Sequence, residues 1–388
     1  AAEGQDYTLA GSASGPVFGE NGLGRFSFRL QDREGQLRNE YLGGEYVDFK
    51  ESAAFRGRLL FTPSEELTID LRAQYLDQDG GSGYFMPGSD FFLPLPPPNP
   101  PIIVDVPEYE IQANRIGESF VDSSEVSAKI DYDLGWATLT SITSYTEVDS
   151  GNDQDLDQTF VEAIDIIVID ESETFAQEFR FVSPDDRSLR WVAGVSWFSQ
   201  DRFRSLGTTF LGNVVPPAAQ DLKLEDLAVF GNLSYDLSDA MELTLAFRWD
   251  EETPEDVTQA RSATFSEFQP KASLAYRFDE NLLGYVTIGK GFRAGGFNNL
   301  APGSNFQPGF DRESLVSYET GIKGTAWDGR LRAGLSLFFI DYTDQQYFLF
   351  DQTGTQANIN VPKSEIAGGE LELAAQVTDK LLLNLGVA

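Results

Sequence analysis

The chain has 388 residues, and its 62 Asp and Glu against 28 Lys and Arg give a formal net charge of −34. This acidity excludes nucleic-acid binding, which needs Lys and Arg to replace the counterions of phosphate. Neither Cys nor His occurs, which excludes thiol nucleophiles, disulfides, Ser-His-Asp triads and His-ligated metals. We therefore expect no metal site and no bound cofactor.

The clearest alternation of apolar and polar residues begins at residue 67. Its odd positions are apolar and its even positions polar, in the order Leu67, Thr68, Ile69, Asp70, Leu71, Arg72, Ala73, Gln74 and Tyr75. Successive side chains of a strand point to opposite faces, so the odd residues are predicted to face lipid and the even residues the lumen. The same period recurs in 242–249, 271–278 and 370–377. The sequence therefore predicts an all-β protein.

Tight turns punctuate the chain at clusters of Asp, Asn, Ser, Gly and Pro, the residues that favour turn dihedrals. These clusters lie near 19–20, 63–66, 133–135, 184–186, 237–239, 279–281, 328–329 and 378–380. Between neighbouring turns we expect two strands of roughly 10–16 residues and one long polar loop. The expected loops lie around 80–120, 150–170, 205–221, 294–311 and 347–361.

Short turns at one end and long loops at the other are typical of an outer-membrane β-barrel, with the turns periplasmic and the loops external. Aromatic residues also cluster beside the turns, where an interfacial girdle would lie. The pattern predicts an antiparallel up-and-down transmembrane β-barrel with about 16 strands in this chain.

Four segments are similar to a known family. They read ETFAQEFR at 173–180, YVTIGKGFRAGGFN at 285–298, SYETGIK followed by DGRL at 317–331, and SEIAGGELE at 364–372. Together they resemble the siderophore-receptor-like branch of the TonB-dependent receptors of the Gram-negative outer membrane. Each motif is weak alone, and the resemblance depends on their order and spacing.

The resemblance implies a 22-stranded barrel closed around a plug, of which residues 1–388 would be a partial barrel domain. The plug domain and the final strands are then expected outside this sequence. The strands present would form either an incompletely closed, curved sheet or a smaller barrel whose edges meet.

The implied function is active import of a scarce ligand, and we favour an iron–siderophore complex. The implied partners are outer-membrane lipid, lipopolysaccharide, a small-molecule ligand and the TonB complex, which is reached through the plug. No enzymatic reaction is implied, and the 388 residues alone are expected to be inactive. Two alternatives stay open, namely a passive porin-like channel and a secreted soluble β-protein that binds glycans.

Candidate ligand contacts are aromatic and Arg residues at the expected loops, because rings and guanidinium groups suit planar or anionic chelates. They are Tyr84, Phe85, Phe92, Arg293, Phe297, Asn298, Tyr347 and Phe348. Such loop residues also pack against one another in many proteins. Acidic residues at 149–157 offer oxygen ligands for Ca²⁺ but lack the Gly and distal Glu of an EF-hand. A solvated acidic loop is the favoured interpretation there.

Overall fold

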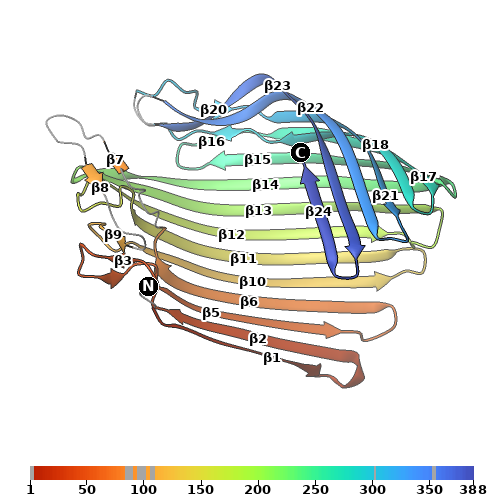
Figure 1. The fold of residues 1–388 in the computed structure, drawn as a ribbon, viewed down its shortest axis with the longest axis horizontal. Coiled ribbons are helices and arrows are strands. Elements are labelled where there is room, and N and C mark those ends of the chain that lie inside the picture. The colour runs from red at the N-terminus through yellow and green to blue at the C-terminus, as the bar shows by residue number, and fades with distance from the viewer. Residues whose placement is uncertain (1–3, 84–90, 94–101, 105–109, 301–302, 352–354) are drawn as a thin grey trace.

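A computed structural model describes residues 4–83, 91–93, 102–104, 110–300, 303–351 and 355–388 (Figure 1). Its main sheet has 17 strands, of which β16 (Arg261–Ser262) is a two-residue addition to β15. The other sixteen are β1 (Asp6–Pro16), β2 (Gly22–Arg33), β5 (Lys50–Phe61), β6 (Leu67–Gly81), β10 (Glu118–Asp133), β11 (Thr138–Asp155), β12 (Ile164–Val182), β13 (Leu189–Phe210), β14 (Asn213–Ser238), β15 (Met241–Asp256), β17 (Phe265–Asp279), β18 (Leu282–Arg293), β21 (Glu313–Ala326), β22 (Leu331–Phe350), β23 (Gln356–Thr378) and β24 (Leu381–Val387).

Each long strand pairs antiparallel with the next one along the chain, which is the predicted up-and-down topology. The sheet is strongly curved, with β1 along one edge and β24 along the other (Figure 1). In the described part of the chain no ladder joins these two edges. Of the two predicted forms, the incompletely closed sheet is confirmed.

The predicted tight turns are confirmed, because each joins two neighbouring long strands. Their chemistry is local. The Asp133 carboxylate accepts the N–H of Gly135 at 2.7 Å, and Gly135 has a φ of +80°, which favours glycine. Asp279 accepts the N–H of Asn281 in the same way at 2.7 Å. A 3₁₀ turn, η1 (Gly19–Asn21), connects β1 to β2.

The predicted loop at 205–221 is wrong. There β13 and β14 continue as a hairpin in which Phe210 pairs with Asn213. The turn residues Leu211 and Gly212 have φ values of +49° and +72°, as the two central positions of a tight hairpin turn require. Strands are also longer than predicted, because β14 alone has 26 residues. The loops expected at 150–170 and 347–361 are shorter for the same reason, because β11 ends at Asp155 and β12 begins at Ile164, and because β22 ends at Phe350 and β23 begins at Gln356.

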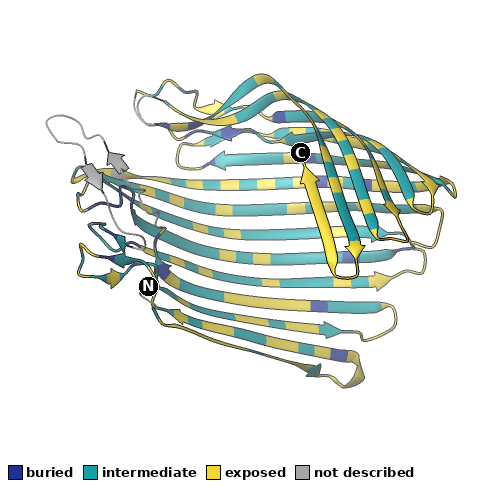
Figure 2. Ribbon diagram, viewed as in Figure 1, coloured by how far each residue is buried: buried dark blue, intermediate teal, exposed yellow. Residues whose placement is uncertain are grey.

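Both faces of the sheet follow the predicted alternation along 67–75. Asp70 binds the guanidinium groups of Arg58 and Arg72, so these three polar side chains share the inner face. Leu71 lies opposite Leu59 in the ladder, on the outer face. Figure 2 shows exposed and half-buried residues alternating along the long strands.

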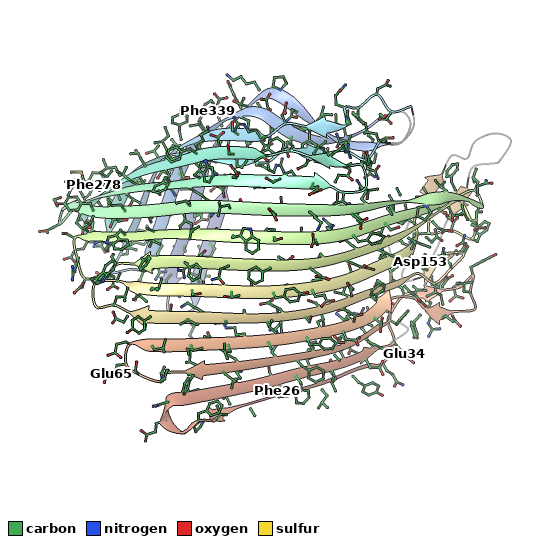
Figure 3. All side chains as sticks on the ribbon, turned by 180° about the vertical axis from the view of Figure 1, so that it is seen from behind. Phe26, Glu34, Glu65, Asp153, Phe278 and Phe339 are labelled. Atoms are coloured by element: carbon green, nitrogen blue, oxygen red, sulfur yellow. The ribbon has the colours of Figure 1, made fainter. Side chains whose placement is uncertain are left out.

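Aromatic rings gather on the outer face at the turn end. The indole of Trp136 stacks on Phe181 at 6.0 Å and on Trp191 at 6.1 Å. Tyr276 and Phe278 meet edge to face at 4.9 Å. Figure 3 places Phe278 at this end of the sheet, opposite the loop end. Such rings suit a membrane interface, as predicted. No helix of the described residues is long and apolar enough to cross a membrane.

Several short strands form small separate sheets at the loop end. They are β3 (Arg38–Asn39), β4 (Glu45–Tyr46) and β9 (Glu110–Ile111) in one small sheet, β7 (Phe91–Leu93) with β8 (Ile102–Val104), and β19 (Gly296–Phe297) with β20 (Gly309–Phe310). The fully buried apolar side chains Val47, Ile111 and Ala113 form a core beside the first of these sheets.

Candidate functional site

The loops at the external end, together with the ends of the strands that they join, form two groups. The N-terminal loop cluster consists of 34–49, 110–117 and 153–165, and the C-terminal loop cluster consists of 253–264, 294–300, 303–313, 344–351 and 355–360. In the first cluster, the Asn39 amide donates to the carbonyl of Ala113 at 2.8 Å. The rings of Tyr41 and Phe160 lie 6.1 Å apart, which joins this small sheet to the loop between β11 and β12.

Two carboxylates of the acidic loop at 149–157 are buried. The favoured interpretation of this segment as a solvated loop is therefore wrong for these two residues. Asp155 and Asp157 are 1% and 2% exposed. Asp155 accepts backbone N–H groups from Asp157 at 2.9 Å, Gln158 at 2.8 Å and Asn114 at 3.3 Å. Asp157 accepts the N–H of Ile164 at 2.9 Å. The two carboxylates therefore accept hydrogen bonds from backbone N–H groups that have no strand partner where the ladder of β11 and β12 ends.

Burial, followed by the charge of Asp157, raises the pKa of Asp155 to about 7. Asp155 lies 17 residues beyond the start of β11, whereas a tilted strand crosses the hydrocarbon region in about 9–11 residues. The carboxyl group is therefore outside the membrane. No cluster of acidic residues in the described part of the chain is arranged to hold a metal ion.

Arg261 and Asn298 hold the C-terminal loop cluster together. The Arg261 guanidinium donates to the Asp256 carboxylate at 2.5 Å and to the carbonyls of Asn298 and Pro308 at 3.2 and 2.8 Å. It also lies 4.9 Å over the Phe297 ring. The predicted ligand contacts Phe297 and Asn298 are thus placed where loops meet, and Asn298 is only 6% exposed.

Arg293 reaches the same cluster from the end of β18. Its guanidinium pairs with Glu313 at 3.1 Å and remains 59% exposed. Glu313 in turn accepts the backbone N–H of Gln346 at 2.6 Å, and the Gln346 amide donates to the carbonyl of Ala294 at 2.8 Å. The chain just before the predicted residues Tyr347 and Phe348 is therefore anchored beside Arg293.

Five predicted contacts thus belong to the C-terminal loop cluster: Arg293, Phe297, Asn298, Tyr347 and Phe348. Tyr347 and Phe348 are consecutive in β22 and pair with Ile359 and Asn358, so their side chains point to opposite faces of the sheet. Tyr347 and Phe348 are 43% and 55% exposed. Phe92 lies in β7, of which the backbone is described, and Tyr84 and Phe85 lie outside the described residues. Sequence reasoning missed Glu313, Gln346 and Asn358, because each acts through contacts 33 to 60 positions away.

Acidic partners accompany most cations of the loop end. Arg115 pairs with Asp153, Arg202 with Asp170, Arg261 with Asp256, Arg293 with Glu313, and Arg312 with Glu267 at 3.4 Å. An anionic ligand would therefore have to displace a carboxylate. The pair of Arg293 is the most exposed of those in the C-terminal loop cluster.

The outer surface becomes acidic beyond the apolar band. A groove of about 510 Å³ is lined by Glu147, Asp149, Glu171, Glu173 and Asp201, with Lys223 pairing to Asp201 at 3.0 Å. The ladder register places Glu147, Glu173 and Asp201 on the same face as Tyr75.

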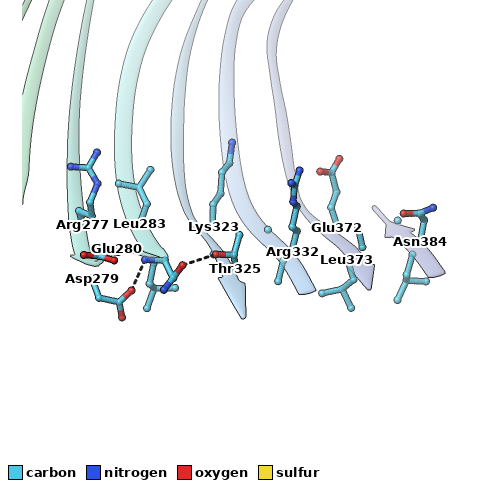
Figure 4. Close-up of a pocket in the computed structure, with 18 residues that line it drawn as sticks. Arg277, Asp279, Glu280, Leu283, Lys323, Thr325, Arg332, Glu372, Leu373 and Asn384 are labelled. Carbon is cyan, nitrogen blue, oxygen red and sulfur yellow. Dashed lines mark hydrogen bonds between the residues drawn. The ribbon is translucent and has the colours of Figure 1, made fainter. Parts of the chain in front are cut away.

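A second recess, of about 710 Å³, lies at the turn end between β17 and β24 (Figure 4). Its walls carry Arg277, Lys323 and Arg332, and it is also lined by Asp279, Glu280 and Glu372. Positive and negative charges therefore balance in this recess.

A curved antiparallel sheet of sixteen long strands, with short turns at one end and long loops at the other, is the architecture of an outer-membrane β-barrel. The family described as "TonB dependent receptor-like, beta-barrel" matches residues 54–388. The chain belongs to this family. Its place is therefore the outer membrane of a Gram-negative bacterium, and it is not an enzyme, because the family consists of transporters.

Similar solved structures share the fold. The ferric yersiniabactin uptake receptor FyuA from Yersinia pestis has a TM-score of 0.79 at 13% identity, over 98% of this chain and 58% of that chain. The ferripyoverdine receptor of Pseudomonas aeruginosa has a TM-score of 0.69 at 17% identity, over 99% and 54%.

A curated relative is the ferric-pyoverdine M114 receptor PbuA of Pseudomonas sp. (strain M114). It is 25% identical over 190 residues, which are 46% of this chain and 22% of that protein. The chain therefore spans little more than half of these solved receptors and about a fifth of the curated one.

Proposed function

We propose that the chain forms part of the barrel of an outer-membrane receptor that imports an iron–siderophore complex with energy supplied through TonB. The observation that carries the proposal is the C-terminal loop cluster, which holds exposed aromatic side chains and the exposed guanidinium of Arg293 at the external end of a TonB-dependent receptor sheet. The names of the relatives support the ligand class, because those receptors take ferric yersiniabactin and ferric pyoverdine.

Chemically, the exposed ring of Phe348 offers a face for stacking on a planar chelate, whereas Tyr347, the preceding residue of β22, points to the opposite face of the sheet. Arg293 offers charge-assisted hydrogen bonds to its anionic groups. Glu313 is only 12% exposed and also accepts the backbone N–H of Gln346, so displacing it from Arg293 has a cost that a ligand carboxylate or hydroxamate must offset with its own hydrogen bonds. We further propose that the plug domain and the remaining barrel strands lie outside these 388 residues, so that this chain alone binds without transporting.

The test is a fluorescence titration of the chain, refolded in detergent, with ferripyoverdine and ferric yersiniabactin. We expect saturable quenching by at least one ferric chelate, weakened about fivefold or more in Phe348→Ala and Arg293→Gln. Phe278→Ala serves as the matched control, because that ring lies on the outer face at the turn end. Quenching by neither chelate, or equal loss in the control, would count against the proposal.

Planar-bilayer recording separates the porin-like alternative. A passive channel would give a steady conductance that does not depend on ligand. We expect no such conductance from this chain. The soluble glycan-binding alternative is disfavoured, because the outer face carries exposed apolar side chains on strand after strand, including Leu71, Val126, Val195 and Leu245.

We propose outer-membrane lipid and lipopolysaccharide as the surrounding partners. The apolar outer face supports contact with lipid, and the acidic groove above it faces the level of the external headgroups. Carboxylates there approach lipid phosphates favourably only when divalent cations lie between them. Chelation with EDTA should therefore weaken co-purification of lipopolysaccharide, and an unchanged yield of lipopolysaccharide would contradict this partner.

A further inference from the structure

The ladder between β17 and β18 stops short of the external ends of both strands. Its last pair in that direction is Lys271 with Gly289. On their other sides the strands stay paired further, β17 with β15 as far as Phe265 and β18 with β21 as far as Arg293. The stretch in which 265–270 and 290–293, all of them described residues, form no ladder with each other is called the seam.

Side chains replace the ladder along the β17 edge of the seam. Pro270, the first residue of β17 beyond the ladder, has no N–H to donate. Phe268 and Ser266 alternate with it, so their backbone groups point to the same side of the strand. The N–H of Phe268 donates to the Glu267 carboxylate at 3.2 Å, and the Ser266 carbonyl accepts from the Arg312 guanidinium at 2.6 Å. Backbone groups that would leave an open edge are thus bonded by side chains.

Glu267 also joins the two sides of the seam. Its carboxylate pairs with the Lys290 ammonium on β18 at 2.6 Å and with the guanidinium of Arg312, the residue before β21, at 3.4 Å. The Glu267 side chain is only 11% exposed, whereas those of Lys290 and Arg312 are 32% and 49% exposed. Residues of this chain therefore bury the carboxylate that both cations share, and its charge is compensated where it lies.

The seam lies at the external boundary of the membrane. Pro270 is 9 residues before Asp279, the last residue of β17 at the turn end. A tilted strand crosses the hydrocarbon region in about 9–11 residues. Separation of the strands beyond Pro270 therefore exposes backbone groups to water and headgroups, which can bond them, and not to hydrocarbon.

Contacts across the seam nearer the loops are also made by side chains. The Arg261 guanidinium, at the end of β15 and β16, donates to the carbonyl of Asn298 at 3.2 Å. The Phe265 ring lies so close to Gly295 that a Cβ added there would come within 2.6 Å of it. In contrast to the part below Lys271, the external part of this boundary has no backbone ladder in the described residues.

The predicted ligand contacts belong to the β18–β23 side of the seam. Arg293 pairs with Glu313 of β21, and Asn298 exchanges hydrogen bonds with Asn358 of β23. Their position relative to β17 and the strands before it therefore depends on the side-chain contacts that cross the seam.

We propose that Glu267 is a latch residue. Its ion pairs with Lys290 and Arg312 hold the external ends of β17 and β18 together, and the ladder from Lys271 to Asp279 is the hinge below them. When the latch is released, the β18–β23 side separates from β17 and carries Arg293 with it. Glu267 is thus a positioning residue for the ligand contacts, a consequence that rests on the proposed function, whereas the latch itself does not.

The test is a distance measurement by pulsed electron spin resonance between two nitroxide labels, one on each side of the seam. The chain has no Cys, so Ser262→Cys and Thr343→Cys, both at exposed positions, label the detergent-refolded chain at these sites alone. We expect a narrow distance distribution in the parent and one roughly twice as wide in Glu267→Gln. Gln keeps an oxygen for the N–H of Phe268 but loses the charge, so the change reports the ion pairs and not the strand edge.

Variants of Lys290 and a matched control define the outcome. Lys290→Met should widen the distribution in the same way, whereas Lys290→Arg keeps the charge and should leave it narrow. Glu365→Gln is the control, because Glu365 pairs with Lys363 at 2.7 Å within β23 and does not cross the seam. The latch is overturned if Glu267→Gln leaves the distribution unchanged, or if Glu365→Gln widens it as much.

Fluorescence titration with ferripyoverdine and ferric yersiniabactin tests the positioning role separately. Glu267→Gln should weaken the chelate that the parent binds about threefold or more, because the contacts are less preorganised, and Lys290→Arg should not. Wider distances with unchanged affinity would overturn the positioning role. A parent that binds neither chelate would count against the proposed function, whereas a wider distribution in Glu267→Gln would still support the latch.

Discussion

Asn298 and Asn358 exchange two hydrogen bonds across 60 positions of the chain. The Asn298 amide nitrogen donates to the carbonyl of Asn358 at 2.9 Å, and the backbone N–H of Asn358 donates to the Asn298 amide oxygen at 2.9 Å. The same amide nitrogen also donates to the carbonyl of Gln307 at 3.0 Å. One side chain therefore joins the loop after β18 to the start of β23.

Replacing Asn298 with Ala should loosen the C-terminal loop cluster. The change leaves buried backbone groups without partners, and each such group costs about 1–3 kcal/mol. We expect faster amide hydrogen exchange at 296–300 and 355–360, with little change in the unfolding midpoint of the whole sheet. Asn299→Ala is the control, because Asn299 is exposed and accepts one bond, at 3.3 Å. Unchanged exchange in Asn298→Ala would contradict the role assigned to the amide.

Replacing Asp70 with Asn should destabilise the sheet around β5 and β6. The change leaves the opposed guanidinium groups of Arg58 and Arg72 without their shared counter-charge. Breaking a fully buried pair costs more, but the exposure of both arginines reduces the expected loss to about 1–2 kcal/mol. Urea unfolding in detergent measures it. Asp79→Asn on the same strand, where the Asp is exposed, should have no effect, and equal midpoints for both variants would refute the prediction.

Features that depend on local chemistry could be predicted from the sequence. The turn at Asp133 and Gly135 needs only a side-chain acceptor two residues before a glycine, and the two-residue period along 67–75 needs only alternating polarity. The contacts of Asn298 could not be predicted, because the sequence does not show which loops meet. The burial of Asp155 could not be predicted either. The local sequence around an Asp in a polar stretch is the same whether its carboxylate is solvated or accepts backbone N–H groups.

The hairpin at 205–221 was missed for a physical reason. Gly207 and Pro217 are residues that usually mark loops. In the structure they coincide at a register shift, because Leu206 pairs with Ala218 while Thr208 pairs with Val215. The second ladder of β14 begins only at Leu222, so the missing N–H of proline breaks no bond there.

Replacing Leu71 with Arg tests which face meets lipid. Leu71 is 43% exposed on the outer face opposite Leu59. Arg on the lipid face costs about 2–4 kcal/mol near the midplane of the bilayer. Refolding from urea into lipid vesicles should show this loss. Gln74→Arg is the matched control, because Gln74 lies on the inner face and contacts Glu125 at 2.6 Å. A control that loses as much stability as Leu71→Arg would reverse the assignment of the faces.

The pH dependence of the N-terminal loop cluster should follow Asp155. Burial, and then the charge of Asp157, raises the pKa of Asp155 from its ordinary value of 3.8 to about 7. The folded loop therefore holds a proton that the unfolded loop has already released between these pH values. This contribution to stability is fully present below pH 4 and is lost as the pH rises through 7.

Amide hydrogen exchange at Asp157 and Gln158, whose N–H groups donate to Asp155, measures this local stability. After correction for intrinsic exchange, their protection should fall with rising pH between about 4 and 7, at most tenfold per unit. Asp155→Asn keeps an acceptor oxygen but does not titrate, so its protection should be level over the same range. Protection that instead increases with pH in the parent would mean that the three backbone donors outweigh burial and that the ionised carboxylate is the stable form.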